Sequence, residues 1–146
     1  MQVLGIKTDL IKPGDDLADK LEKAMNDADL ALQDGDILVV SESTLATAEG
    51  RLVYLENVEP SPLARLMADR YEKDPREMQL ILEESDQIVG GIPGVVLTLR
   101  EGFLYPNAGI DNSNAPPGSV VLFPSHPLAS ARQIRERLGK GRNIAV

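Results

Sequence analysis

The chain has 146 residues, of which 42% are hydrophobic, so it is long enough for about one domain with an aliphatic core. It contains no cysteine, which excludes disulfides, thiolate zinc sites and cysteine nucleophiles. With a net charge of -8, the chain lacks the excess of basic residues that is typical of nucleic-acid-binding proteins. No apolar run reaches the roughly 20 residues that are needed to cross a membrane. We therefore expect neither a nucleic-acid partner nor a membrane segment.

The first forty residues predict two strands separated by a helix. Residues 1–7 have the pattern of a short strand. Asp15 or Asp16 can then cap a helix that runs to about Leu32, because apolar residues recur at three- and four-residue spacing. Residues 37–40 form a continuous apolar run, which is typical of a strand buried on both faces.

A polar segment and two further helices follow. Residues 41–50 are expected to be an irregular polar loop, and residues 51–54 a strand. Pro62 fits the first position of the next helix, and Asp74 can cap the helix after it. The apolar spacing of the first of these helices predicts a buried stripe made of Leu63, Leu66, Met67 and Tyr71. In the second helix the residues that point one way are Met78, Ile81 and Leu82.

The last part of the chain is richer in strands. Residues 95–99 and 103–105 are expected to form a hairpin across a short glycine-containing connection. Residues 119–123 predict another strand, and the last helix is expected over residues 128–138. Residues 143–146 look like the opening of one more strand.

These elements mix helices and strands without a strict βαβ order, and the glycine-rich residues 90–94 are expected to be a turn. The fold class is therefore α+β, with a mixed, largely antiparallel sheet and about four packed helices. We expect residues 1–146 to form a single domain.

Residues 107–118 gather one carboxylate, several amides and a hydroxyl in a segment that can be neither helix nor strand. Asp111, Ser113 and Asn114 offer many oxygen ligands within a short loop. Two interpretations fit this composition. One is a polar turn, since these are the usual turn residues. The other is a site for a hard cation such as Mg²⁺, which takes one or two carboxylates together with substrate phosphates.

The remaining polar candidates are less informative. His126 is the only histidine and stands where the last helix begins, which favours a capping or surface role over a general base. The adjacent acids Glu83 and Glu84 are expected to be solvated. Glu49 and Arg51 flank a glycine, so they fit a turn with a surface ion pair or, alternatively, a site where Arg51 holds a phosphate or carboxylate.

The most specific motif is Asn-Ala-Gly-Ile-Asp-Asn-Ser-Asn over residues 107–114. Three weaker segments precede it, at residues 11–17, 34–40 and 48–51. In their residues, order and spacing, the four segments together resemble the coenzyme F-420 gamma-glutamyl ligase family. The resemblance covers essentially the whole chain.

This resemblance implies an enzyme that adds L-glutamate, through its amine, to the deazaflavin coenzyme precursor. The family uses GTP and a divalent metal, Mg²⁺ or Mn²⁺. Its implied mechanism phosphorylates the terminal carboxylate to an acyl phosphate, which the glutamate amine then attacks. The resemblance also implies a homodimer in the cytoplasm.

The resemblance assigns roles to four residues and leaves the catalytic residues unknown. Asp111 falls on a metal ligand of the family, and Asn114, three residues on, falls on a nucleotide contact. Ser43 matches the hydroxyl residue that follows the apolar run, also on the nucleotide side. Leu10, at the end of the first polar loop, belongs to the same nucleotide-binding group.

Two departures from the family pattern bear on activity. Thr47 stands where the family usually has lysine, and a hydroxyl cannot replace an ammonium charge beside phosphates. Family members are typically much longer, and further metal ligands would follow Val146. We therefore expect this chain alone to hold about half of the active site and to be inactive as a ligase. The alternative is a non-catalytic module that binds a nucleotide or the coenzyme.

Overall fold

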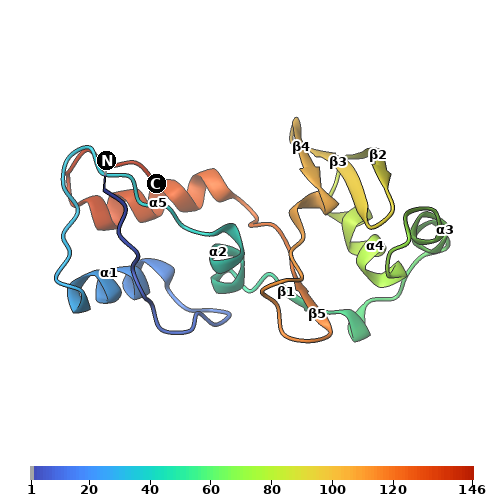
Figure 1. Ribbon diagram of the computed structural model, residues 1–146, viewed down its shortest axis with the longest axis horizontal. Helices are drawn as coiled ribbons and strands as arrows, with labels where there is room; N and C mark the ends of the chain where they lie inside the picture. The colour runs from blue at the N-terminus through green and yellow to red at the C-terminus, as the bar shows by residue number, and fades with distance from the viewer. Residues whose placement is uncertain (1) are drawn as a thin grey trace. The chain divides into compact units, whose positions relative to one another are not determined.

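The computed structural model describes residues 2–146, and Met1 lies outside the described residues. Its helices and strands gather into two compact units (Figure 1). The first unit joins the segment up to Gly50 with Pro124–Val146, and the second unit is Arg51–Phe123. The second unit is therefore inserted between the two segments that form the first.

Three helices surround the core of the first unit: α1 (Leu17–Asp27), α2 (Glu42–Ala48) and α5 (Pro127–Gly139). The helix predicted over residues 128–138 is confirmed as α5, with one more residue at each end. Burial of aliphatic side chains between the helices is the main stabilisation of this unit. These side chains include Leu17, Leu21, Met25, Leu38, Ile134 and Leu138.

Helix α1 begins where its cap predicts and ends earlier than its apolar pattern predicts. The Asp16 carboxylate accepts a hydrogen bond from the Asp19 N–H (3.1 Å), which satisfies one of the free donors of the first turn. The helix stops at Asp27, because Asp29 takes a left-handed conformation with φ of 53°. The predicted end near Leu32 is therefore wrong, although the start is correct.

Of the three strands predicted in the first unit, at residues 1–7, 37–40 and 143–146, the structure has only one isolated bridge between the last two. Residues 2–7 form no strand. Residues 37–40 and 143–146 meet only in an isolated parallel bridge between Ile37 and Ala145. Leu38 is 6% exposed but Val39 is 86% exposed, so burial on both faces was a wrong prediction. A run with a single short neighbour lacks a second layer to cover its other face.

The expected polar loop at residues 41–50 is instead mostly the helix α2. Ser41 has an extended conformation at its start, Glu42 lies in its first turn, and Gly50 follows its end with φ of 75°. Within these limits the segment contains no proline or glycine and includes two alanines and a leucine, which favour helix. The polar side chains alone suggested a loop, and this prediction was wrong.

The second unit contains two α-helices, two short 3-10 helices (η) and five strands. Their order is β1 (Leu52–Tyr54), η1 (Leu55–Asn57), α3 (Pro62–Tyr71), α4 (Pro75–Glu83), β2 (Gln87–Ile92), β3 (Val95–Arg100), β4 (Phe103–Pro106), η2 (Asn107–Gly109) and β5 (Ser119–Val121). Strands β2, β3 and β4 form one antiparallel sheet, and β1 pairs antiparallel with β5. The α+β class is confirmed, with five α-helices and two antiparallel sheets across residues 2–146.

Helices α3 and α4 pack on each other through the core of the second unit. In α4 the predicted Met78 and Ile81 are fully buried. In α3 the buried residues are Ala64, Ala68 and Tyr71, and Met67 is partly buried against the same core. The predicted stripe is therefore confirmed for Tyr71 and in part for Met67, but is wrong for Leu63 and Leu66, which are 55% and 67% exposed. Small alanines allow close approach of two helices, so Ala64 and Ala68 face the core in place of the leucines.

The predicted hairpin is confirmed as β3 and β4, which turn through Glu101 and Gly102 with φ of 50° and 83°. The glycine-rich residues 90–94 are not simply a turn. Gly90 and Gly91 lie within β2, and only Pro93 and Gly94 form the turn to β3. The sheet therefore has one more strand than the sequence predicted.

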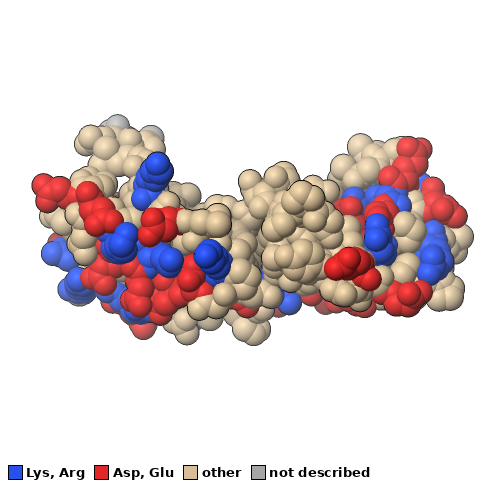
Figure 2. All heavy atoms as spheres, turned by 90° about the horizontal axis from the view of Figure 1, so that it is seen from below, with Lys and Arg blue, Asp and Glu red and all other residues tan. Residues whose placement is uncertain are grey.

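Opposite charges are interspersed over the surface of the first unit (Figure 2). Arg137 of α5 bonds Asp16 and Asp19 of α1, and Lys140 bonds Glu22 (2.5 Å). Such exposed pairs contribute little to stability individually. No helix within residues 2–146 has the length and apolar character that a membrane crossing requires.

Candidate metal and nucleotide site

Three consecutive residues with positive φ lead into the loop that carries the predicted site. Asn107, Ala108 and Gly109 have φ of 50°, 56° and 75°. Left-handed backbone is uncommon for residues other than glycine and is strained for alanine. The surrounding structure must therefore hold this turn in place.

Hydrogen bonds to the neighbouring hairpin hold the turn. Asn107 Oδ1 accepts from the backbone N–H of Val96 (2.9 Å). The hydroxyl of Thr98, which is fully buried, accepts from the Ala108 N–H (3.1 Å) and donates to the Tyr105 carbonyl (2.9 Å). The Asn and Ala of the motif thus have a structural role, which is to anchor the turn to β3 and β4.

Gly109 is required at its position for two reasons. Its φ of 75° favours glycine, and a Cβ built there would lie 2.5 Å from Cδ2 of Phe123. The Phe123 ring in turn packs against Tyr105, with ring centroids 4.8 Å apart. The turn at Gly109 therefore packs directly against the Phe123 ring of this aromatic pair.

Asp111 is fixed through both its backbone and its side chain. Its N–H and carbonyl bond to the carbonyl and N–H of Val121 at 2.9 and 2.8 Å. Its Oδ1 accepts from the N–H and the hydroxyl of Ser113 at 2.8 and 2.7 Å, and its Oδ2 accepts from Asn114 Nδ2 at 2.9 Å. The structure thus brings the predicted Asp111 and Asn114 into direct contact.

The Asp111 carboxyl is suited to bind a cation. Its burial acts to raise the pKa, but the hydrogen bonds from Ser113 and Asn114 outweigh this effect, so the pKa lies below its ordinary value. The group is therefore ionised at neutral pH. Oδ1 already accepts two hydrogen bonds and Oδ2 only one, which leaves Oδ2 with a free lone pair.

Asp111 would supply one ligand of a larger set. Within residues 2–146 no group of three or more His, Cys, Asp or Glu side chains is arranged to hold a metal ion. A hard cation such as Mg²⁺ commonly keeps waters and binds through one or two carboxylates together with phosphate oxygens. A single open carboxylate oxygen fits that pattern.

The other two predicted site residues, Leu10 and Ser43, belong to the first unit, whereas Asp111 and Asn114 belong to the second. Leu10 is 78% exposed, and Ser43 is buried, with its hydroxyl 2.9 Å from that of Ser41. The four predicted site residues are thus divided between the two units, two in each.

Thr47 lies in α2, where its hydroxyl donates to the carbonyl of Ser43 (2.8 Å). A threonine hydroxyl that bonds its own helix four residues back is a common local arrangement. The side chain at this position is thus neutral and already has a partner.

Glu49 and Arg51, which were expected to pair or to bind an anion, each bond within their own unit. Glu49 accepts from the Ser125 N–H (3.0 Å) and the Ser130 hydroxyl (2.7 Å). Arg51 bonds Glu84 (2.5 Å) and, through Nε, the carbonyl of Phe123 (3.1 Å). The guanidinium therefore has internal partners at the place where a phosphate was considered.

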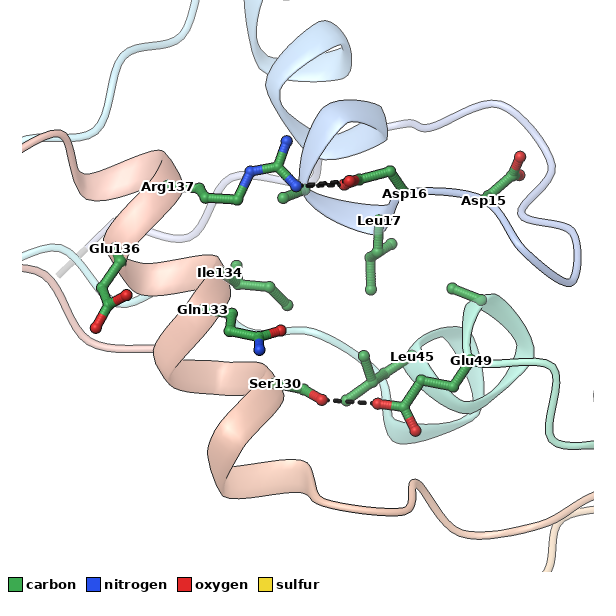
Figure 3. Close-up of a pocket in the computed structure, with 12 residues that line it drawn as sticks. Asp15, Asp16, Leu17, Leu45, Glu49, Ser130, Gln133, Ile134, Glu136 and Arg137 are labelled. Carbon is green, nitrogen blue, oxygen red and sulfur yellow. Dashed lines mark hydrogen bonds and ion pairs between the residues drawn. The ribbon is translucent and has the colours of Figure 1, made fainter.

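A pocket of about 470 Å³ lies in the first unit between α1, α2 and α5 (Figure 3). Arg137 donates to Asp16, and the Ser130 hydroxyl donates to Glu49. The hydrogen bond from Arg137 lowers the pKa of Asp16. The lining also includes Asp15 and Glu136, and together these groups do not identify a class of ligand.

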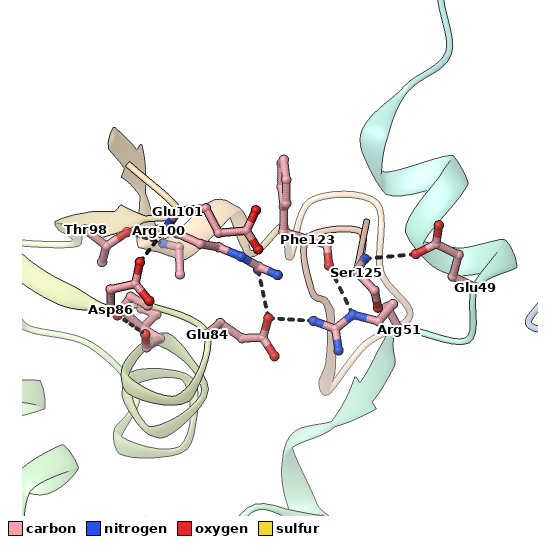
Figure 4. A network of polar contacts seen from close by, with 12 residues as sticks. Glu49, Arg51, Glu84, Asp86, Thr98, Arg100, Glu101, Phe123 and Ser125 are labelled. Carbon is pink, nitrogen blue, oxygen red and sulfur yellow. Dashed lines mark hydrogen bonds and ion pairs between the residues drawn. The ribbon is translucent and has the colours of Figure 1, made fainter. Parts of the chain in front are cut away.

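Sequence reasoning missed Glu84, which was expected to be solvated. Its side chain is only 17% exposed and bonds two arginines, Arg51 and Arg100 (Figure 4). No local pattern shows this, because the three residues are separated by 16 or more positions. His126 is the N-cap residue of α5, as expected, but its side chain makes no capping hydrogen bond.

Comparison with known proteins places the chain in a family. A family model described as F420-0:Gamma-glutamyl ligase matches residues 5–146. The chain therefore belongs to the F420-0:gamma-glutamyl ligase family.

Relatives in several archaea support this assignment. The chain is similar to a coenzyme F420:L-glutamate ligase of Methanopyrus kandleri, with 42% identity over 88% of this chain and 49% of the relative. A protein of the same name in Methanothermobacter thermautotrophicus is 40% identical, over 94% of this chain and 56% of the relative. The chain thus spans about half the length of these relatives.

Proposed function

We propose that this chain binds GTP together with Mg²⁺ or Mn²⁺ and takes part in gamma-glutamyl ligation to the coenzyme F-420 precursor. The observation that carries the proposal is the Asp111 carboxylate, which is ionised, has an open lone pair and contacts Asn114. Membership of the ligase family supplies the reaction class. The substrates, L-glutamate and the deazaflavin coenzyme, follow from the names of the relatives.

The proposed reaction proceeds in two balanced steps. The terminal carboxylate of the precursor takes the γ-phosphoryl group of GTP, which gives an acyl phosphate and GDP. The amine of L-glutamate then attacks the acyl carbon, loses a proton, and expels inorganic phosphate as the amide bond forms. When bound, the divalent metal neutralises charge on the phosphate oxygens.

Within this scheme the residues of the second unit bind and orient. Asp111 would hold the metal through its carboxylate, and Ser113 fixes the orientation of that carboxylate through Oδ1. Asn114 donates to Asp111 with its Nδ2, which leaves its own Oδ1 as an acceptor for the nucleotide. Leu10 and Ser43 are also proposed as nucleotide contacts, as the family resemblance implies.

A titration with GTP tests the metal assignment. The isosteric Asp111→Asn removes the anionic ligand, and Asp69→Asn, an exposed aspartate in α3 of the same unit, is the control. Calorimetry with GTP in Mn²⁺ should show binding for the wild type and the control, and at least tenfold weaker binding for Asp111→Asn. Equal affinity in all three proteins would refute the role of Asp111.

A second candidate function is a module that binds nucleotide or coenzyme without ligation. The observation in its favour is Thr47, a neutral side chain bonded to its own helix where a lysine is expected in the family. We expect no glutamylated product from residues 1–146 with GTP, Mn²⁺, glutamate and the coenzyme precursor. Mass detection of a product larger by one glutamate would rule out the module and assign ligation to this chain alone.

The assembly and compartment are also proposals. We propose a homodimer in the cytoplasm, as the family resemblance implies. Sedimentation of the purified chain at several concentrations should give twice the mass of one chain.

A further inference from the structure

Glu84, at the C-terminal cap of α4, joins two arginines through one oxygen (Figure 4). Its Oε2 accepts from Arg51 Nη2 at 2.5 Å and from Arg100 Nη1 at 2.9 Å. The side chain of Glu84 is 17% exposed, that of Arg51 23% and that of Arg100 14%. Partial burial strengthens such charge-assisted bonds and limits the freedom of all three side chains.

Both arginines also contact one aromatic residue, Phe123. Arg51 Nε donates to its backbone carbonyl at 3.1 Å. The Cζ of Arg100 lies 5.4 Å from the centroid of its ring, within the range of a cation–π contact. A single carboxylate, Glu84, thus fixes two guanidinium groups that hold the carbonyl and the ring of the same residue.

Phe123 connects this cluster to the candidate metal ligand. Its ring is in contact with Gly109, two residues before Asp111 in the left-handed turn. Val121, two residues before Phe123 and the last residue of β5, bonds both the N–H and the carbonyl of Asp111. The N–H of Leu122, between them, donates to the carbonyl of Arg51 (2.9 Å). The contacts from Glu84 to Asp111 therefore form a continuous series within the second unit.

We propose that Glu84 is a positioning residue for the Asp111 carboxylate, acting through Arg51, Arg100 and Phe123. This inference rests on the proposed role of Asp111 as a metal ligand. Glu84 itself touches no ligand. Through the two arginines it fixes the position of the Phe123 ring and carbonyl. Phe123 in turn supports the left-handed turn at residues 107–109, which orients Asp111.

Glu84→Gln tests the inference with the smallest change in shape. The neutral amide cannot balance two guanidinium groups, so both arginines lose their strongest partner and Phe123 loses its restraint. Residues that orient metal ligands from behind typically affect metal affinity by 10- to 100-fold. We expect Glu84→Gln to weaken Mn²⁺ binding in the presence of GTP by about tenfold.

The measurement is the electron paramagnetic resonance of free Mn²⁺, titrated with protein and GTP. It gives both the dissociation constant and the number of sites. A merely structural role would lower the number of sites, because part of the protein would unfold, and would leave the affinity of the remaining sites unchanged. The control is Glu83→Gln, an exposed acid one residue earlier that bonds only Gln79 (2.6 Å) in its own helix. It should match the wild type in both quantities.

A second variant keeps the inference testable if Glu84→Gln fails to fold. Phe123→Leu leaves the ion cluster and the backbone bond from Arg51 intact and removes only the ring beside Gly109. It should also weaken Mn²⁺ binding at an unchanged number of sites, and an unchanged affinity would overturn the inference.

The two proposals fail in different ways. Wild-type affinity in Glu84→Gln, with binding lost in Asp111→Asn, contradicts the positioning role and leaves the metal assignment in place. Unchanged binding in Asp111→Asn contradicts the metal assignment itself. Weaker binding in both variants, with Glu83→Gln unaffected, supports both proposals.

Discussion

The Asp111 carboxylate owes its lowered pKa to two neighbours in its own loop. Ser113 and Asn114 donate to it and lower its pKa against the effect of burial. These contacts span only three residues, so the sequence alone could predict them. The left-handed turn before Asp111 depends on Thr98 and Phe123, which come from distant parts of the chain, and no local pattern reveals that dependence.

The pKa of Asp111 predicts how its contribution to stability changes with pH. A carboxyl whose pKa is lowered by folding stabilises the native state above its unfolded pKa, and this contribution is lost as the pH falls through the folded pKa. We expect Asp111→Asn to be less stable than the wild type by roughly 1 kcal/mol at pH 7, because hydrogen bonds to a charged group are lost. Urea unfolding should show this difference shrinking below about pH 4. A difference that stays constant or grows toward low pH would contradict the assignment.

Gly109 gives a second prediction, with a matched control. Gly109→Ala places a methyl group against the Phe123 ring and forces alanine into left-handed backbone, whereas Gly118→Ala has a similar φ of 77° but open space around it. The backbone effect alone costs about 1 kcal/mol, and the contact should raise the loss at Gly109 to about 2 kcal/mol or more. Thermal unfolding of both variants measures the difference. Equal losses would mean that Phe123 does not restrict this turn.

Among the secondary-structure elements, helix caps are the features that sequence predicts best. Asp74 accepts from the Arg76 N–H (2.8 Å) at the start of α4, whereas His126 at the start of α5 makes no capping bond. Asp74→Ala should lower the free energy of unfolding by about 1 kcal/mol, and His126→Ala should leave it nearly unchanged. Urea unfolding at pH 7 provides both values. A larger loss in His126→Ala than in Asp74→Ala would refute this comparison of the caps.

Elements were predicted less well where their burial depends on a partner. Residues 37–40 look like a buried strand because they are apolar, but Leu38 is buried and Val40 only partly buried in the core, whereas Ile37 and Val39 are exposed. In α3 the larger leucines suggested the buried side, whereas the structure uses Ala64 and Ala68 because α4 approaches closely. Residues 41–50 were predicted as a loop because their side chains are polar, although their backbone preference is helical. Apolar content was enough to locate most of these elements. Which side of each element is buried depends on the element that packs against it, and the local sequence does not show that.

At the scale of the whole molecule, the first unit is built from the two terminal segments of the sequence, and the second unit from the segment between them. The pair β1–β5 joins Leu52 to Val121, close to the two points where the chain passes between the units. If the second unit unfolds, these points separate, and closing the first unit then costs additional chain entropy. We therefore expect the two units to unfold together, and the single domain expected from the sequence stays a prediction that an unfolding experiment would test.

The chain offers a direct probe of this cooperativity. Its three tyrosines, Tyr54, Tyr71 and Tyr105, all lie in the second unit, and it has no tryptophan. Tyrosine fluorescence therefore reports the second unit, whereas far-ultraviolet circular dichroism reports helices in both. The two signals should change at the same urea concentration. Separate midpoints would show that the units unfold independently.

The central claim is that GTP binds this chain through a divalent metal held by Asp111. The most direct test is a calorimetric titration of the wild-type chain with GTP, once with Mn²⁺ and once with the metal removed by EDTA. The account predicts saturable binding in Mn²⁺ and no measurable binding in EDTA, because the phosphates and the Asp111 carboxylate repel each other without the cation. Equal binding under both conditions, or no binding under either, would contradict it.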